Sequence, residues 1–287
     1  MWYCLLVERK SLKITLPLVV LILFLIPIIT SSLLDLEQKK KDEEAYRQFL
    51  VRQEEKRVEE EKAYLLGKFE PAERGDFVLI PKEYTTLPSP MYLRKEAWDA
   101  FLLMHAAASL DGLDLKLASA TRNFDYQAGI WDKKWTGETL VGGQSLAENI
   151  PDGFERFKKI LEYSAAPGTS RHHWGTDVDI YYAIPSFFET SKGKEIYNWL
   201  VLNAPEFGFC QTYDTKGSTR LAGYNEEKWH WSYLPLSKNF TERYKNLIRE
   251  IDLGGPASDE ASFLGAEYIV SQNIINDYVL SINPECL

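Results

Sequence analysis

Two short stretches of the sequence hold side chains that could bind a metal ion. Ser-Arg-His-His-Trp-Gly-Thr-Asp-Val-Asp spans Ser170 to Asp179, and Glu-Lys-Trp-His-Trp spans Glu227 to Trp231. The 287-residue chain has four histidines, and three of them lie in these stretches. A catalytic zinc ion needs three protein ligands, an open position for water and a base nearby. The two stretches together offer imidazoles, carboxylates and a spare glutamate, so they predict a catalytic zinc site.

The first stretch predicts a loop followed by a strand. Gly175 allows a turn between His172 and Asp179, and the sequence Thr-Asp-Val-Asp-Ile-Tyr-Tyr is rich in β-branched and aromatic residues, which favour a strand. Asp177 and Asp179 are two positions apart, so on a strand both side chains face the same side. One carboxylate could bind the metal while the other orients an imidazole from behind. Strand alternation leaves open which aspartate does which.

The second stretch predicts a strand that begins at about Trp229. On such a strand Trp229 and Trp231 point into the body of the domain, while His230 faces the site. Glu227 can reach the water bound to the metal only if Glu227 lies on a turn before the strand. The Gly-Tyr-Asn sequence just ahead of it favours a turn.

Such a site predicts zinc-dependent hydrolysis of a peptide bond. Zinc lowers the pKa of its water to about 7, and Glu227 would take the proton and later deliver it to the leaving amine. A cation would stabilise the developing oxyanion or hold a substrate carboxylate. Arg122, in Ser-Ala-Thr-Arg-Asn-Phe-Asp-Tyr-Gln, is the leading candidate.

These motifs resemble the zinc D-alanyl-D-alanine carboxypeptidase family, the VanY-like and LD-carboxypeptidase-like enzymes that trim peptidoglycan stem peptides. The family pattern S-x-H-x-x-G-x-A-x-D is matched at Ser170, His172, Gly175 and Asp179. The pattern E-x-W-H is matched at Glu227, Trp229 and His230, and the pattern S-G-Y-R-S-x-x-x-Q at Ser119, Arg122 and Gln127. Asp177 stands where the first pattern has Ala. The resemblance covers about residues 64–250.

The resemblance implies an α+β fold of hedgehog/DD-peptidase type, with a small, mainly antiparallel sheet flanked by helices and the metal in a cleft on the sheet. It implies that zinc is bound by His172, Asp179 and His230 and that Glu227 is the base. It also implies that three residues hold the terminal carboxylate of the substrate: Arg122, Gln127 and Ser170. The implied reaction removes a terminal D-Ala from a peptidoglycan stem peptide. Whether the cleavage is of the DD-carboxypeptidase, LD-carboxypeptidase or endopeptidase type stays open.

Two other functions compete with this hypothesis. A catalytically inactive zinc- or peptidoglycan-binding module on a membrane stalk would be favoured if the base or a ligand were missing, and none is. A structural zinc domain would usually use Cys ligands, and neither stretch has one. Glu227 and Arg122, which a structural zinc ion would not require, favour the peptidase.

An uncharged apolar run from Ile14 to about Leu34, preceded by basic residues, is long enough to cross a bilayer. We favour an uncleaved anchor (residues 1–36) over a signal peptide cut near residues 30–32, because no A-x-A site is present. Both alternatives place the remainder outside the cytoplasm. The favoured one predicts a protein of the cell envelope that is anchored in the inner membrane, with the catalytic domain in the periplasm or outside. Residues 37–63 predict a charged helical linker, 64–250 the zinc peptidase domain, and 251–287 a C-terminal segment that docks on it.

The net charge of −9 argues against nucleic acid as a partner, and nothing in the sequence indicates an oligomeric state. Cys4 precedes the apolar run, whereas Cys210 and Cys286 could form a disulfide or stay as free thiols. His105, in an Ala- and Leu-rich stretch, is expected in the core, and His173 is expected to point away from the metal.

Hydrophobic spacing predicts the other elements. Helices are expected at 95–112, 154–164 and 192–203, and an amphipathic helix at 266–280. Strands are expected at 77–81, 115–120, 207–213 and 228–233.

Overall fold

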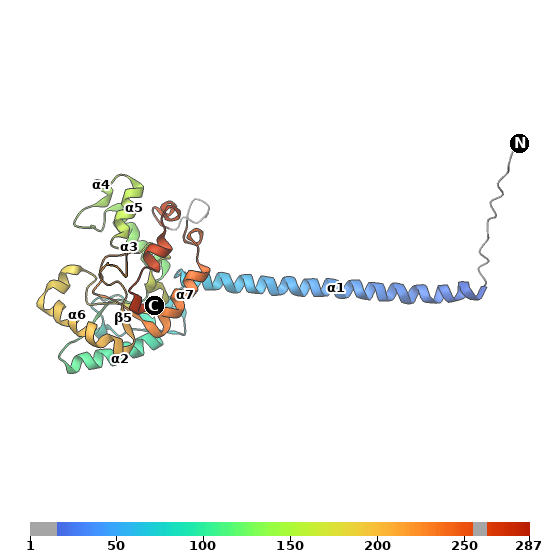
Figure 1. Ribbon diagram of the computed structural model, residues 1–287, viewed down its shortest axis with the longest axis horizontal. Coiled ribbons are helices and arrows are strands. Elements are labelled where there is room, and N and C mark those ends of the chain that lie inside the picture. The colour runs from blue at the N-terminus through green and yellow to red at the C-terminus, as the bar shows by residue number, and fades with distance from the viewer. Residues whose placement is uncertain (1–15, 255–262) are drawn as a thin grey trace. The chain divides into compact units, whose positions relative to one another are not determined.

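The computed structural model describes residues 16–254 and 263–287 (Figure 1). The predictions for Cys4 and for the basic residues ahead of the apolar run lie outside these ranges. The described residues divide into two units, one formed by residues 16–57 and the other by residues 58–254 and 263–287.

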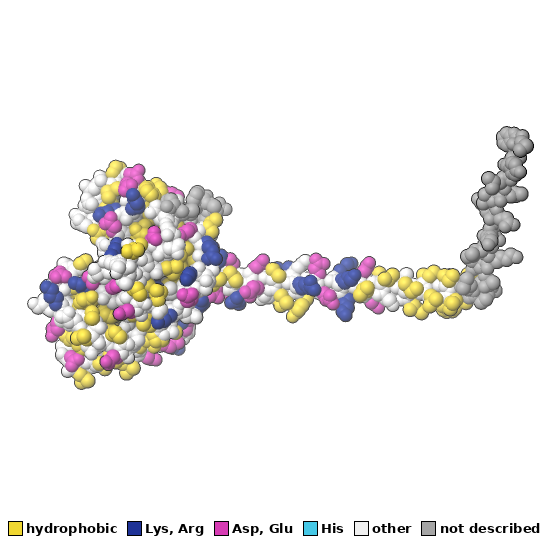
Figure 2. Space-filling model, in the orientation of Figure 1, with side chains coloured by type: hydrophobic (Ala, Val, Ile, Leu, Met, Phe, Trp, Pro, Cys, Tyr) yellow, Lys and Arg dark blue, Asp and Glu magenta, His cyan; other side chains and the backbone are white. Residues whose placement is uncertain are grey.

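Helix α1 (Leu16–Leu65) carries both the apolar run and the charged segment that follows it. It is the helix, among the described residues, that is long and apolar enough to cross a membrane. Figure 2 shows hydrophobic side chains crowded on its first part and side chains of both charges on the rest. The charged segment 37–63 is helical and mostly exposed, as its composition predicts. The last eight residues of α1, from Val58 to Leu65, belong to the second unit, where Leu65 is fully buried.

The second unit is built around a four-stranded antiparallel sheet in the order β3-β4-β6-β5. The strands are β3 (Leu117–Ser119), β4 (Asp177–Ile180), β5 (Phe209–Gln211) and β6 (His230–Tyr233). A separate antiparallel pair is formed by β1 (Phe77–Leu79) and β2 (Tyr92–Arg94). The expected α+β fold with small antiparallel sheets is confirmed, and the predicted strands are present but shorter than the patterns indicated.

The helices of this unit are α2 (Lys95–Leu110), α3 (Phe124–Thr136), α4 (Leu146–Asn149), α5 (Gly153–Leu161), α6 (Ser191–Asn203) and α7 (Leu234–Leu247). α2, α5 and α6 lie where hydrophobic spacing predicts helices. α3 was not predicted as a full helix, although its start is well marked. The Asn123 side chain caps it by accepting a hydrogen bond from the Tyr126 amide, and Gly137, with a φ of 83°, ends it.

Alternation along β4 and β6 separates the site from the core. Val178 and Trp231 pack on one face of the sheet, in a core that α2 and α6 also line. Because successive side chains of a strand point to opposite faces, Asp177, Asp179 and His230 face the other side. The sheet therefore presents polar side chains toward one cleft while its other face is apolar.

The C-terminal stretch 266–280 is not the single amphipathic helix that was predicted. It forms 3-10 turns at Ala266–Ser271 and a π-helical turn at Ile275–Val279. Several of its apolar residues are β-branched, and such residues lose side-chain freedom in an α-helix. The stretch still contributes to the core, because Ile269 and Ile274 are fully buried.

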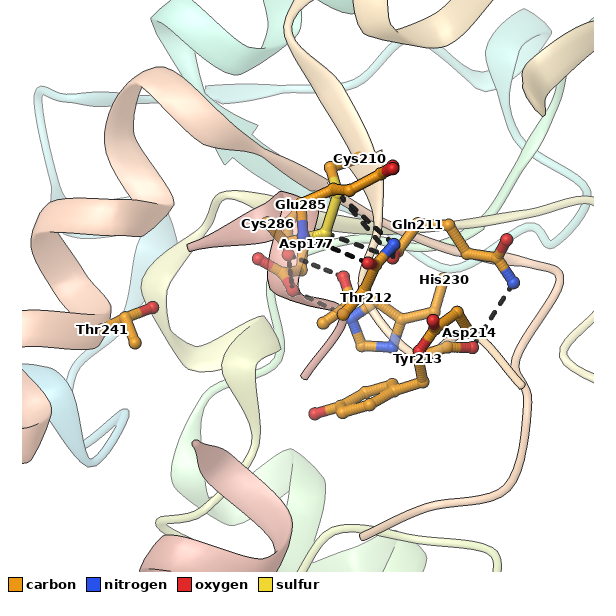
Figure 3. The surroundings of a disulfide bond; sticks show 12 residues. Asp177, Cys210, Gln211, Thr212, Tyr213, Asp214, His230, Thr241, Glu285 and Cys286 are labelled. Carbon is orange, nitrogen blue, oxygen red and sulfur yellow. Dashed lines mark hydrogen bonds and ion pairs between the residues drawn. A yellow bond between two sulfur atoms is a disulfide. The ribbon is translucent and has the colours of Figure 1, made fainter. Parts of the chain in front are cut away.

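A disulfide joins Cys210 on β5 to Cys286, with the two Cα atoms 5.7 Å apart. The sequence alone left this bond open. Figure 3 shows it close to His230, which lies on the neighbouring strand β6. The amide of Thr212, just after β5, donates to the His230 carbonyl at 3.1 Å. The disulfide therefore ties the C-terminal residues to the part of the sheet that carries the candidate site.

Candidate metal centre

Three elements bring together His172, Asp179 and His230: a 3-10 turn, strand β4 and strand β6. His172 lies on a single 3-10 turn (Arg171–Trp174) that Gly175 ends with a φ of 70°. A Cβ at Gly175 would also lie 2.3 Å from the Phe77 ring, so both the backbone and the packing require glycine here. Asp179 on β4 pairs directly with His230 on β6.

The three side chains form a buried cluster whose ligand atoms lie within 4.8 Å of one another. His172 Nε2 is 3.3 Å from Asp179 Oδ1, and His230 Nδ1 is 3.9 Å from the same oxygen. Tetrahedral zinc, with bonds of about 2.0–2.1 Å, would separate its ligand atoms by about 3.3 Å. The separation of His172 Nε2 from Asp179 Oδ1 equals that value, and the separation of His230 Nδ1 from the same oxygen exceeds it by about 0.6 Å.

The hydrogen bonds around the cluster leave a place for a cation. His172 Nδ1 lies 2.7 Å from the Ala120 carbonyl, so this nitrogen carries the proton and Nε2 keeps its lone pair. Among the described residues, neither His172 Nε2 nor Asp179 Oδ1 has a hydrogen-bond partner, although both are buried. Buried polar atoms without partners are costly, and a divalent cation between them would satisfy both. Two imidazoles and one carboxylate form a donor set that zinc accepts.

Asp177 lies behind His230 and not in the cluster. Its Oδ2 accepts hydrogen bonds from His230 Nε2 at 2.8 Å, from Arg171 Nε at 3.2 Å and from the Ser232 hydroxyl at 2.5 Å. The bond to Nε2 leaves Nδ1 of His230 as the atom that faces the cluster. The structure thus distinguishes the two aspartates that strand alternation could not: Asp179 faces the metal position and Asp177 orients an imidazole.

The charges of this cluster are fixed by burial and by close partners. Burial would raise the pKa of Asp177, but Arg171 and the bond to His230 hold it far below its usual range. Burial acts on Asp179 in the same way, and His172 holds its pKa low. Burial lowers the pKa of His172, and the positive charge of Arg122 adds to that effect. The cluster therefore presents a carboxylate and a neutral imidazole, the forms that bind a metal.

Glu227 lies on the turn that precedes β6, as the predicted geometry requires. The His230 amide donates to the Glu227 carbonyl at 3.2 Å, and Glu227 Oε2 lies 2.9 Å from His230 Nδ1. Burial lowers the pKa of His230, but the hydrogen bonds to Asp177 and Glu227 outweigh it and raise that pKa to about 9. Glu227 therefore lies at the edge of the cluster, beside the ring nitrogen that faces the metal position.

The prediction that Trp229 packs into the body of the domain is wrong. β6 begins at His230, so Trp229 lies on the turn before the strand and strand alternation does not apply to it. Trp229 is half-buried and lines the cleft beside Glu227, whereas Trp231 is in the core as predicted.

Arg122 enters the cleft just ahead of α3. Its Nη1 donates to Gln127 Oε1 at 3.1 Å, and its Nη2 donates to Asp179 Oδ2 at 3.3 Å. Gln127 is fully buried and donates to the Ala165 carbonyl at 2.7 Å, so it holds the guanidinium from behind. Ser170 lines the cleft itself.

Of the remaining two histidines, His173 is buried and points away from the cluster as predicted, whereas His105 is only half-buried and not in the core as expected. His173 Nδ1 lies 2.6 Å from the Arg122 carbonyl, and its Nε2 accepts from the Gly168 amide at 3.0 Å. Burial lowers the pKa of His173 to about 3, so it is neutral. His105 is half-buried on α2, with Nδ1 3.0 Å from the Leu115 carbonyl. Neither belongs to the metal-binding cluster.

The cluster opens into a cleft of about 270 Å³. Arg122, Ser170 and Glu227 line it, together with three residues that the sequence did not single out: Lys134, Tyr163 and Tyr213. The Tyr213 ring lies edge-on to the His230 ring, with centroids 5.0 Å apart. The cleft therefore joins the cluster to two arginines, Arg122 and Arg171, to one lysine and to several aromatic rings.

Comparisons with known proteins identify similar carboxypeptidases. The sequence model of VanY, described as D-alanyl-D-alanine carboxypeptidase, matches residues 90–236. The putative carboxypeptidase YodJ of Bacillus subtilis is 30% identical over 182 residues, which are 60% of this chain and 58% of that protein. A D-alanyl-D-alanine carboxypeptidase of Enterococcus faecalis is 32% identical over 133 residues, which are 45% of this chain and 44% of that protein. The chain thus spans about half the length of these curated relatives.

A solved structure of the vancomycin-resistance D,D-pentapeptidase VanY in complex with Zn(II) is also similar. It is 26% identical to this chain, with a TM-score of 0.40, and the match covers 61% of this chain and 94% of that one.

Proposed function

Because this chain belongs to the VanY family of D-alanyl-D-alanine carboxypeptidases, we propose that it is a zinc-dependent carboxypeptidase that removes a terminal D-Ala from peptidoglycan stem peptides. The observation that carries the proposal is the pair of buried atoms without partners, His172 Nε2 and Asp179 Oδ1, with a glutamate beside them. His172, Asp179 and His230 would hold the zinc ion. When bound, zinc supplies a Lewis acid that activates water and polarises the scissile carbonyl.

The residues around the cluster have separate tasks in this proposal. Glu227 takes the proton of the attacking water and passes it to the leaving amine. Arg122 and Ser170 hold the terminal carboxylate of the peptide, and the buried Gln127 keeps the Arg122 guanidinium in position. A fork of N–H donors suits a carboxylate, which explains the use of arginine at this place.

We also propose that α1 anchors the enzyme in a membrane, with the catalytic unit in the cell envelope outside the cytoplasm. The apolar part of α1 exposes large side chains, Leu23 and Phe24 among them, and a helical run of about 20 residues covers the hydrocarbon core of a bilayer. The disulfide between Cys210 and Cys286 supports an oxidising compartment.

The proposed reaction is tested by incubating the full-length chain, in detergent, with stem pentapeptide and tetrapeptide. Mass spectrometry should show the loss of one alanine from at least one of the two peptides. A chelator should abolish the reaction, and added zinc should restore it. The peptide that is shortened identifies the DD- or LD-type cleavage. A zinc-loaded protein that binds these peptides without shortening either one would contradict the proposal and favour an inactive binding module.

Arg122→Ala is expected to raise KM for peptides with a free terminal carboxylate by about 10- to 100-fold, because a charge-assisted hydrogen bond is lost. The same variant should lose much less on a peptide whose C-terminus is amidated. Steady-state kinetics on the matched pair of peptides measures this difference. Elemental analysis for zinc accompanies the kinetics, since Arg122 also contacts Asp179. An equal loss on both peptides would show that Arg122 does not hold the carboxylate.

A further inference from the structure

Lys134 is a cation of the cleft with no assigned task in the reaction. It lies near the end of α3, seven residues after Gln127, and lines the cleft together with Ile130 of the same helix. The side chain is half-buried, and its Nζ donates to the Ser164 hydroxyl. Within the described part of the chain, no carboxylate lies close enough to Nζ to form an ion pair.

The other cations near the cluster each contact a carboxylate of the protein. Arg122 contacts Asp179, and Arg171 contacts Asp177 in a fully buried pair. Burial lowers the pKa of Lys134 to about 8, and Arg122 adds to the shift while Glu227 opposes it. Lys134 therefore stays mainly protonated at neutral pH. Glu227 lines the same cleft and acts on this charge only from beyond ion-pair distance. A half-buried charge without a close counter-ion is costly, so this wall of the cleft favours an anionic ligand.

The position of Lys134 indicates which part of a substrate would meet it. Lys134 and Glu227 line both the metal-binding cleft and an adjoining pocket of about 390 Å³, which Val141 and Ile184 also line. From Gln127, beside Arg122, to Lys134 the helix rises about 10 Å. An extended peptide covers about 3.3 Å per residue. A substrate whose terminal carboxylate is at Arg122 would thus reach Lys134 with one of the residues that precede the scissile bond.

Two glutamates of the adjoining pocket are already engaged with other groups. Glu226 lies 3.4 Å from the Tyr197 hydroxyl and 3.2 Å from the Thr215 hydroxyl, from which it accepts hydrogen bonds. Glu162 pairs with Lys159 at 2.7 Å. Neither forms an ion pair with Lys134, and the third glutamate of this pocket, Glu227, acts on the lysine only from beyond ion-pair distance. Lys134 therefore keeps its charge available to an incoming carboxylate.

We propose that Lys134 forms a second anion-binding subsite, which selects peptides with a side-chain carboxylate on a residue ahead of the scissile bond. The proposal rests on the proposed function and specifies its substrate class. Arg122 would hold the main-chain terminal carboxylate, and Lys134 would hold the second carboxylate.

The test uses two stem peptides that differ at the third residue, which is lysine in one and diaminopimelate in the other. These side chains differ by one carboxylate. With zinc-loaded, full-length protein in detergent, we expect the diaminopimelate peptide to have a kcat/KM about 10- to 100-fold higher, mainly through KM. Lys134→Met should bring the ratio of the two values close to one, and Lys134→Arg should preserve it. Lys133→Met is the matched control, because Lys133 is exposed and pairs with Glu138; its ratio should equal that of the unaltered chain.

The outcomes separate the subsite from the function. Hydrolysis of neither peptide by the zinc-loaded protein would refute the proposed function. Hydrolysis of both at equal kcat/KM, with no change of the ratio in Lys134→Met, would refute the subsite and leave the function standing. A Lys134→Met variant whose kcat falls equally on both peptides would also refute the subsite, since Lys134 would then act through Glu227. Amidation of the diaminopimelate carboxylate should remove the preference, and its retention would count against the subsite.

Discussion

Replacing Glu227 with Gln is expected to lower kcat by about a thousandfold or more while zinc stays bound. The amide keeps the shape of the side chain but cannot accept the proton of the attacking water, and general acid–base catalysis contributes about 10²- to 10⁴-fold. Glu227 is not one of the three residues of the metal-binding cluster, so its loss leaves the ligand set complete. Peptide hydrolysis by mass spectrometry measures the loss, and elemental analysis of the purified variant measures the zinc content.

A surface glutamate provides the control for this experiment. Glu195→Gln makes the same chemical change on an exposed position of α6 and should leave kcat unchanged. Full turnover by Glu227→Gln would remove the base from the proposed mechanism. Loss of zinc together with loss of turnover would show that Glu227 supports the metal and is not primarily a base.

The types of side chain in the cluster could be predicted from the sequence because short spacings bring them together, whereas the choice of Asp179 as the third ligand was implied by the family resemblance. The glycine between His172 and Asp179 requires a turn, and alternation along the next strand sends Asp177 and Asp179 to one face. Which aspartate faces the metal position depends on the pairing of β4 with β6, since Asp179 lies opposite His230 and Asp177 lies two residues away. That register depends on the pairing of two strands that are far apart in the sequence, so the sequence of β4 alone does not predict it.

The lysine of the cleft was missed for a related reason. Gln127, Ile130 and Lys134 have the i, i+3, i+7 spacing of one helix face, a signal that predicting α3 would have revealed. At 266–280, by contrast, a helix was predicted that the structure does not have. The apolar spacing was present, but the β-branched residues opposed the helix. Periodicity shows which side chains are buried more reliably than it shows the backbone that buries them.

Replacing Asp177 with Ala, the residue of the family pattern, is expected to weaken both the fold and the metal site. Arg171 and Asp177 are fully buried, so removal of the carboxylate leaves an unpaired charge and costs about 3–5 kcal/mol of unfolding free energy. His230 Nε2 loses the acceptor that orients the ring, and loss of such a partner lowers metal affinity by about 10- to 100-fold. Denaturant unfolding measures the first effect, and zinc competition with a chromophoric chelator measures the second.

The double variant Arg171→Met, Asp177→Ala separates these two effects. Removing both members of a buried ion pair is often close to neutral, so the double variant should regain most of the lost stability. Its zinc affinity should stay low, because His230 still lacks an acceptor for Nε2. If zinc affinity returned with stability, Asp177 would act only by neutralising Arg171. Unchanged zinc affinity in Asp177→Ala alone would mean that the packing around His230, including the Tyr213 ring, is enough to orient the imidazole.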